Sequence, residues 1–283
     1  MARRLESEFG SAAMAWTRYP WHATQLTRDA LSNGYETIVS VGGDGTLNEV
    51  VNGFFVNGKQ INTSARLGII STGTGADFAK TIGLARGIDA GLDRLSRNSV
   101  KRCDVGRVTS HSTQNVREER YFINVADAGF GGVAAAFVNR GTKAFGGPVS
   151  YLLGLVKTLA VYRNHGLHIK VNNDYDRTGA INSVIVANGQ YFGGGMWIAP
   201  QALLDDGAFE IIIIGNVSNW EILANTHRLY KGTITDHPKV TSLKGTKISL
   251  HSDELVAIEA DGEIAGTAPV TFELVPGAIN LVS

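Results

Sequence analysis

Cysteine is almost absent from this chain of 283 residues, which contains Cys103 alone. One cysteine excludes an internal disulfide framework and cannot by itself build a zinc site. The seven histidines show no metal-binding spacing such as His-Glu-x-x-His. Because no signal peptide precedes Arg3 and Arg4, the sequence predicts a cytoplasmic protein.

An excess of charge of either sign is also missing. The 26 Lys and Arg residues balance the 26 Asp and Glu residues, and no long basic run occurs, so we expect no nucleic-acid partner. The longest apolar helical pattern, residues 149–162, is too short to span a bilayer and carries Lys157. We therefore expect no transmembrane segment, and a lipid substrate would be reached from the membrane surface, with transient peripheral attachment.

The hydrophobic pattern changes near residue 105. Before it, strand patterns (37–41, 67–70) alternate with helix patterns (24–32, 47–55, 77–82), which indicates a parallel α/β sheet. After it, short apolar runs predominate, at 121–125, 168–171, 182–187, 208–214, 247–250, 256–260 and 271–275, with helices at 149–162 and 220–230. The predicted fold class is a doubly wound parallel α/β domain over 1–105, followed by a β-rich, antiparallel β-sandwich-like domain over 106–283.

The strongest chemical signal is a glycine-rich turn between the strand at 37–41 and the helix at 47–55. Glycines let the backbone approach a phosphate, and the start of a helix favours an anion. An acidic residue in the turn repels that anion unless a divalent cation lies between them, which a magnesium nucleotide would supply. We expect Thr46 to cap the helix in a capping box with Glu49. The turn consists of Gly42, Gly43, Asp44, Gly45 and Thr46.

A second glycine loop follows the next strand and contains Gly73 and Thr74. Neighbouring parallel strands open their loops at the same sheet edge, so the two loops are expected to face one ligand. Alone, this loop is weak evidence, because Gly-Thr-Gly more often forms a flexible turn.

Together, these motifs and several later ones resemble the diacylglycerol kinase catalytic-domain family, in particular the soluble bacterial lipid kinases. GGDGT is shared with NAD kinases and phosphofructokinases, whereas the later motifs select lipid kinases. In order, the motifs are GGDGTLNEVVNG (42–53), GTGADFAK (73–80), CDVG (103–106), ANG (187–189), FGGGM (192–196), APQA (199–202), DG (206–207) and EADGE (259–263).

The resemblance implies that ATP and a lipid meet in the cleft between a nucleotide-binding domain and a β-rich domain. The glycine turn, Gly73 and Thr74 would bind the nucleotide phosphates. Magnesium would involve Asp44, Asp104 and Asp206, while Asp261 would be the general base and Glu263 its neighbour at the metal or phosphate. A homodimer is compatible with this interpretation.

Asp261 and Glu263 lie two residues apart, so in an extended strand they would share a face, as suits a base beside a metal ligand. Without the family resemblance, a type I′ hairpin turn at Asp261 and Gly262 is the favoured interpretation, and the resemblance reverses that preference.

Two positions depart from the family pattern, because Ser71 and Ala76 stand where Pro and Asn are usual. The alternatives to a diacylglycerol kinase are therefore a kinase of another acceptor, such as a sphingoid base or NAD, and a catalytically weak nucleotide- or lipid-binding regulator.

The start of the sequence is also unusual for this family, whose members open with an apolar strand and an Asn-Pro and glycine turn. Here residues 1–9 match the end of the following helix instead, which predicts that the first strand is missing from this chain. We expect the next strand at residues 12–16 to lack a neighbour and to leave sheet edges exposed.

Overall fold

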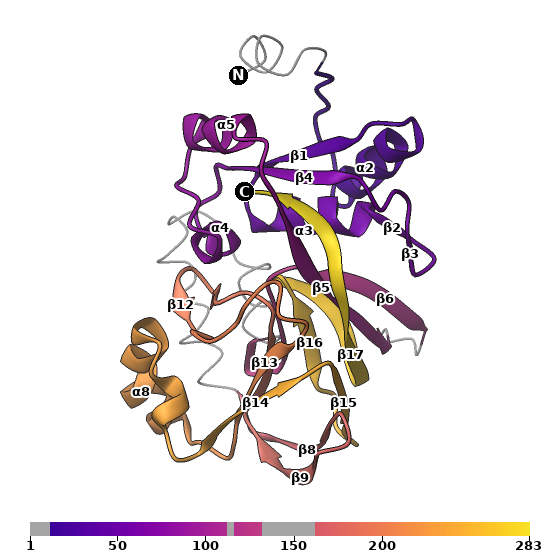
Figure 1. Cartoon of the computed structure of the whole chain (residues 1–283). Helices are drawn as coiled ribbons and strands as arrows, with labels where there is room; N and C mark the ends of the chain where they lie inside the picture. The colour runs from indigo at the N-terminus through magenta and orange to yellow at the C-terminus, as the bar shows by residue number, and fades with distance from the viewer. Residues whose placement is uncertain (1–11, 112–115, 132–161) are drawn as a thin grey trace.

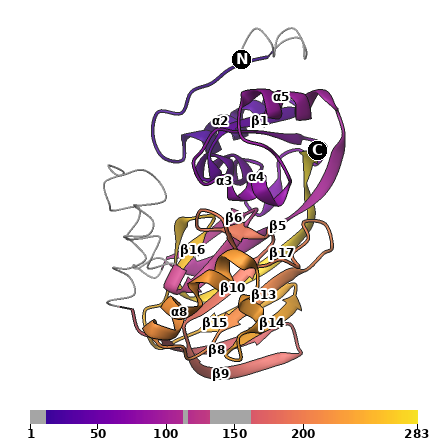
Figure 2. The ribbon, with the colours of Figure 1, turned by 90° about the vertical axis from the view of Figure 1, so that its left-hand side faces the viewer.

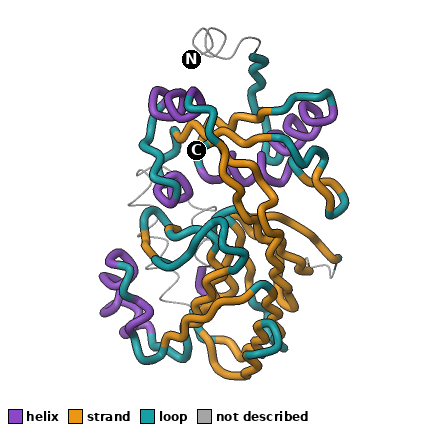
Figure 3. Tube along the Cα trace, in the orientation of Figure 1, coloured by secondary structure: helices purple, strands orange, loops and turns teal. Residues whose placement is uncertain are grey.

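The computed structural model describes residues 12–111, 116–131 and 162–283. Helices surround a few strands in the N-terminal part, and antiparallel strands make up most of the rest (Figure 1). The tube in Figure 3 shows the same division, with most helices at the upper end and most strands, together with one further helix, at the lower end. An α/β unit followed by a β-sandwich-like unit confirms the predicted fold class.

The N-terminal part has two parallel strands between helices. β1 and β4 pair in parallel along their whole length. The apolar residues of β4 are buried, whereas those of β1 are half-buried or exposed. The elements of this part are α2 (His22–Ser32), β1 (Thr37–Gly42), α3 (Asp44–Gly53), β2 (Phe55–Val56), β3 (Lys59–Gln60), β4 (Arg66–Ser71), α4 (Asp77–Thr81) and α5 (Ile88–Ser96).

The C-terminal part is built from antiparallel pairs. Its elements are β6 (Arg117–Phe122), β7 (Val125–Gly129), β8 (His165–Val171), β9 (Tyr175–Ile181), β10 (Ser183–Ala187), β11 (Tyr191–Phe192), β12 (Met196–Trp197), β13 (Phe209–Ile214), α8 (Asn219–Lys231), η2 (Ile234–Asp236), β14 (Val240–Gly245), β15 (Lys247–His251) and β16 (Ala257–Ala260). Alternation along these strands places one set of side chains in a core within the sheet and the other set in a core on its α8 side.

Two long strands join the parts. β5 (Val100–His111) pairs antiparallel with β17 (Glu263–Val282), and both run from one part into the other (Figure 1). At its far end β17 also pairs in parallel with β4, at Asn280 and Leu281. The last strand of the sequence therefore completes the N-terminal sheet, and the predicted boundary at residue 105 falls inside β5.

Several sequence-based predictions need correction. No strand forms at residues 12–16, which the structure describes as irregular. The predicted strand at 121–125 is two strands, because the chain breaks between β6 and β7 at Ile123 and Asn124. The predicted helix at 149–162 falls almost entirely outside the described residues. The predicted strand at 271–275 is the middle of a much longer strand, β17. The other predicted elements form within a few residues of their expected bounds.

Candidate active site

The two glycine loops touch each other. The carbonyl oxygen of Gly42 accepts hydrogen bonds from the backbone N–H groups of Thr72 (2.9 Å) and Gly73 (3.2 Å). A Cβ atom on Gly73 would lie only 2.4 Å from the Cα of Gly43, so no residue with a side chain fits there without moving the backbone. The two loops therefore lie side by side, as expected, and their binding of one ligand stays a prediction.

Helix α3 starts directly in the glycine turn. Its N-cap is Gly43, no side chain caps it, and the helix begins at Asp44 rather than after Thr46. The predicted capping box is therefore wrong, because Glu49 instead accepts a hydrogen bond from the N–H of Ala23 on α2 (3.0 Å). The first N–H groups of α3 have no intrahelical acceptor, and the positive end of the helix dipole points out of the turn.

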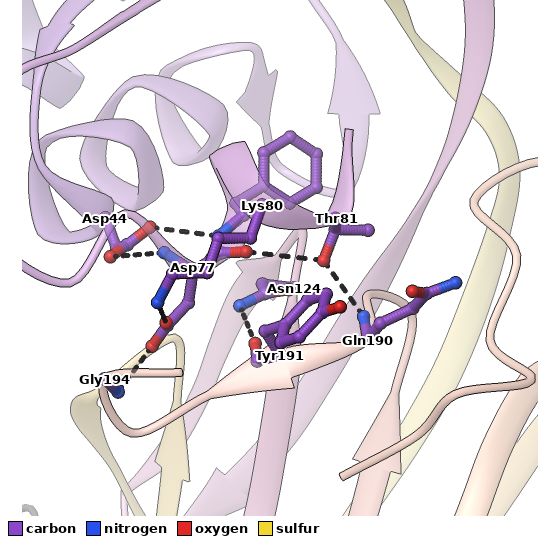
Figure 4. A network of polar contacts seen from close by, with 9 residues as sticks. Asp44, Asp77, Lys80, Thr81, Asn124, Gln190, Tyr191 and Gly194 are labelled. Carbon is purple, nitrogen blue, oxygen red and sulfur yellow. Dashed lines mark hydrogen bonds and ion pairs between the residues drawn. The ribbon is translucent and has the colours of Figure 1, made fainter. Parts of the chain in front are cut away.

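Asp44 links the first glycine loop to the second. Its carboxylate accepts hydrogen bonds from the N–H groups of Asp77 and Phe78, both at 3.2 Å (Figure 4). Burial is the main cause that raises the pKa of Asp44, and the neighbouring charge of Asp77 raises it further. Asp44 and Asp77 thus form an acidic pair. Lys80 is the cation beside this pair, because its Nζ lies 3.0 Å from Asp77 Oδ1.

The network around Asp77 extends into the C-terminal part. Gly194, in the turn between β11 and β12, donates its N–H to Asp77 Oδ2 at 2.7 Å, and Thr81 Oγ1 accepts from the N–H of Gln190 at 3.0 Å (Figure 4). These contacts fix the β11–β12 hairpin against α4. Sequence reasoning missed the roles of Asp77 and Lys80, although both stand in the motif GTGADFAK, because it assigned them only to the start of a helix.

The β16–β17 hairpin holds Asp261 in place. Asp261 and Gly262 both have positive φ angles, 51° and 88°, which is the geometry of the type I′ turn considered for this site. The Asp261 carboxylate accepts four hydrogen bonds of 2.9–3.1 Å. Their donors are Asn48 Nδ2 and the N–H groups of Ile123, Asn124 and Val125. Burial raises the pKa of Asp261 to about 6.

Glu263 lies on the other side of the same turn. It is exposed, and its Oε1 would be 3.7 Å from a Cβ atom on Gly45, so its carboxylate lies against the first turn of α3. The expectation that Asp261 and Glu263 share one face is wrong, because the chain turns between them instead of running extended. The hairpin therefore places one carboxylate inside the protein and the other at the glycine turn.

The remaining predicted metal ligands bind protein groups. Asp104 is buried and accepts from the N–H groups of Gly207 (2.9 Å) and Gly277 (2.6 Å). Asp206 Oδ2 accepts from Lys244 Nζ at 2.7 Å. Within residues 12–111, 116–131 and 162–283, no three His, Cys, Asp or Glu side chains form a group that could hold a metal ion. Magnesium coordination by Asp44, Asp104 and Asp206 stays a prediction.

Two family models cover most of the chain. Residues 1–108 match the diacylglycerol kinase catalytic domain, and residues 124–283 match the YegS C-terminal NAD kinase beta sandwich-like domain. The first match includes the glycine turn, and the second includes the β16–β17 hairpin.

Individual relatives agree with these models. The chain is 29% identical to a diacylglycerol kinase of Staphylococcus carnosus over 272 residues, covering 96% of this chain and 84% of that protein. It is 30% identical to a diacylglycerol kinase of Staphylococcus haemolyticus over 250 residues, covering 88% and 72%. A crystal structure of a diacylglycerol kinase from Bacillus anthracis has the same fold, with a TM-score of 0.70, 19% identity and coverage of 99% and 87%.

Proposed function

The chain belongs to the family of diacylglycerol kinases and YegS-like lipid kinases, and from that premise we propose that it transfers the γ-phosphoryl group of ATP to a hydroxyl group of a lipid such as diacylglycerol. Phosphoryl transfer requires little covalent chemistry from a protein, which mainly positions the reactants and offsets their charge.

The two touching glycine loops would bind the nucleotide phosphates. The N–H groups at the start of α3 and the positive end of its dipole attract an anion, and the missing side chains at Gly43 and Gly73 let it approach the backbone. Gly42, Asp44, Gly45, Thr46 and Thr74 complete this proposed binding surface. Lys80 is the nearest cation in the network around Asp44 and Asp77 and would offset phosphate charge.

We assign the role of general base to Glu263 in preference to Asp261. A base must reach the lipid hydroxyl and accept its proton, and Glu263 is exposed beside the glycine turn. The four donors on Asp261 occupy both of its oxygens and join the hairpin to α3 and to the β6–β7 connection. Asp261 therefore acts as a positioning residue, which fixes the turn that carries Glu263.

Magnesium would reach this site as part of the substrate Mg·ATP, in which it offsets charge on the phosphates. Asp44 is the predicted ligand that lies in the glycine turn. Burial and the charge of Asp77 raise its pKa, so a cation bound there would favour its charged form. The carboxylates of Asp104 and Asp206 would serve to hold the chain together, through the N–H groups and the Lys244 ammonium that they bind.

A membrane-facing surface is needed if the acceptor is a lipid. In the described part of the chain, no helix is both long and apolar enough to cross a bilayer. Helix α8 instead has an exposed stripe at a spacing of three and seven residues, with Trp220 80%, Leu223 53% and Tyr230 52% exposed. Tryptophan and tyrosine favour the interface between water and lipid, so we propose that α8 rests on the membrane surface.

The observation that carries the proposal is the meeting of both glycine loops and Glu263 at the start of α3. ADP release should be measured with Mg·ATP and diacylglycerol, sphingosine, phosphatidylglycerol or NAD as acceptor. We expect release with diacylglycerol vesicles. Release with NAD alone would make the protein a kinase of a soluble acceptor, and nucleotide binding without release with any acceptor would make it a regulator.

A further inference from the structure

A polar depression lies at the amino-terminal end of α8, where the loop after β13 contacts the residue before β8. Figure 2 shows α8 in front of the strands and below the N-terminal part of the molecule. The depression is open to solvent and has a volume of about 550 Å³, which is within the range of small-molecule sites. We call it the α8 depression. Its border includes Arg163, Asn164, Asn216, Glu221 and Lys239.

Cations outnumber anions at the α8 depression. The Arg163 guanidinium is exposed and forms no ion pair or hydrogen bond with any of the described residues. Lys239 Nζ lies 2.7 Å from Glu221 Oε1, and Glu221 is the one carboxylate among the described residues of the border. An ammonium group has three N–H donors, so this pair leaves two of them for another acceptor. Two cations and one carboxylate give the depression a net positive charge, which favours an anion.

An asparagine network orients a further donor beside these cations. Asn164 Nδ2 donates to Asn216 Oδ1 at 2.7 Å and to the carbonyl oxygen of Val217 at 2.8 Å. Asn164 is itself held by Asn182, whose Nδ2 donates to Asn164 Oδ1 at 3.0 Å. Because the oxygen of Asn216 accepts within the network, its amide nitrogen keeps its donors for a ligand. Donors that are oriented before a ligand arrives lose less entropy when it binds.

An exposed aromatic side chain adjoins the α8 depression. Trp220 is 80% exposed and stands in the sequence between Asn219 and Glu221, which both border the depression. Leu223 and Tyr230 continue the exposed stripe along α8. Indole groups favour the depth of a bilayer at which the head groups lie. Apolar side chains next to cations are typical of a surface that binds an anionic membrane.

We propose that the α8 depression binds the phosphate group of an anionic membrane phospholipid. Arg163, Lys239 and the Asn216 amide would donate hydrogen bonds to the phosphate oxygens, and Trp220 would enter the interface beside them. The hydrocarbon chains stay in the bilayer, so the site selects a head group. A phosphodiester is singly anionic, which the net charge of the depression balances. The choice of a membrane lipid over a soluble phosphate compound rests on the proposed function.

Sedimentation with vesicles, without nucleotide, tests the site directly. The whole chain is mixed with vesicles of phosphatidylcholine, or of equal parts of phosphatidylcholine and phosphatidylglycerol, at the same ionic strength. We expect the wild type to bind the mixed vesicles at least about fivefold more tightly, because one cation at an anionic surface contributes about that factor. Added salt should reduce the difference, because the attraction is electrostatic.

A matched pair of charge variants locates the binding. Arg163→Gln removes a cation that has no partner among the described residues, and it should weaken binding to the mixed vesicles about fivefold. Lys59→Gln changes the net charge of the protein equally, at an exposed position of the β2–β3 hairpin, which lies on the opposite side of Figure 1 from α8. This variant should bind as the wild type does.

A pair of aromatic variants tests the interface beside the depression. Trp220→Ser should weaken binding to both kinds of vesicle, because the indole favours the interface whatever the head group. Tyr35→Ser, at an exposed aromatic residue of the N-terminal part, should leave binding unchanged. Equal binding by the two aromatic variants would contradict the placement of Trp220 in the interface.

The water-soluble head group distinguishes a membrane from a free phosphate compound. Glycerophosphoglycerol should bind at least about a hundredfold more weakly than the mixed vesicles in a calorimetric titration, since it has no interface for Trp220 to enter. The proposal is overturned if the wild type binds both kinds of vesicle alike, if Arg163→Gln binds as tightly as Lys59→Gln, or if the head group alone binds as tightly as the vesicles. Because these measurements need neither nucleotide nor turnover, they decide the site even when phosphoryl transfer fails.

Discussion

Two regions of the C-terminal part each bring two carboxyl groups together, but they surround them differently. At the β16–β17 hairpin, Asp261 accepts four hydrogen bonds and Glu263 is exposed beside the glycine turn. In the β7–β16 pair, Asp127 and Glu259 lie opposite each other and are both buried. The first arrangement suits polar chemistry at a water-exposed phosphate, whereas in the second burial raises the pKa of both carboxyl groups.

The largest expected effect tests the exposed carboxylate of the hairpin. Glu263→Gln should lower kcat by roughly two to four orders of magnitude, because the amide keeps the shape but cannot accept the proton. The midpoint of urea unfolding should not change, since the side chain is exposed. Steady-state kinetics and urea unfolding of the same preparation measure both. A kcat within a factor of about three of the wild type would remove Glu263 from the role of base.

The next effect tests the buried carboxylate of the same hairpin. Asp261→Ala leaves the four donors without their acceptor and should lower the free energy of unfolding by about 2–4 kcal/mol. Urea denaturation followed by circular dichroism measures this loss. If Asp261→Ala and Asp261→Asn both keep wild-type stability but lose turnover as Glu263→Gln does, Asp261 rather than Glu263 is the base.

A smaller effect is expected at the two glycine loops, where the nucleotide would bind. Gly73→Ala would place a methyl group 2.4 Å from the Cα of Gly43 and should separate the loops, raising the KM for ATP about tenfold or more. Gly179→Ala on β9, where a Cβ atom meets nothing within 4 Å, is the control. An unchanged KM for ATP in Gly73→Ala would show that the close contact of the loops is unimportant for the nucleotide.

The smallest effect concerns the buried carboxyl group of Asp127 on β7. The pKa of Asp127 is about 7 when folded, above the ordinary value of 3.8, so the folded protein binds more protons than the unfolded chain between these values. The free energy of unfolding should therefore fall as pH rises from 5 to 7, by up to about 1.4 kcal/mol per pH unit from this group. Asp127→Leu should make the decrease shallower. Urea unfolding at several pH values measures it, and equal slopes in both proteins would contradict the raised pKa.

The sequence predicted the glycine loops and their convergence, because glycine spacing, strand polarity and helix starts are local signals. It could not distinguish the roles of Asp261 and Glu263, since that depends on donors from Asn48 and from the break at Ile123 and Asn124, which are far away in the chain. The pairing of Asp127 with Glu259 could not be predicted either. An aspartate inside an apolar run does not show which residue lies opposite it in the sheet.

The same limit explains the errors at the start of α3 and in the hairpin. Thr46 and Glu49 have the spacing of a capping box, but Glu49 instead accepts a hydrogen bond from the N–H of Ala23 on the neighbouring helix α2. Asp261 and Glu263 have the spacing of one strand face, but the positive φ angles at Asp261 and Gly262 reverse the chain between them. In both cases the residue spacing predicted a local structure that did not form, because a contact or a turn of the folded chain is incompatible with it.

The central claim is phosphoryl transfer to a lipid at the start of α3, and transfer of a radiolabelled γ-phosphoryl group from Mg·ATP tests it most directly. The wild type and Glu263→Gln would be incubated with diacylglycerol vesicles and extracted with organic solvent. We predict label in a phospholipid product with the wild type and at least about a hundredfold slower labelling with Glu263→Gln. Label that stays in ATP or free phosphate with the wild type, or equal labelling by both proteins, would contradict the account.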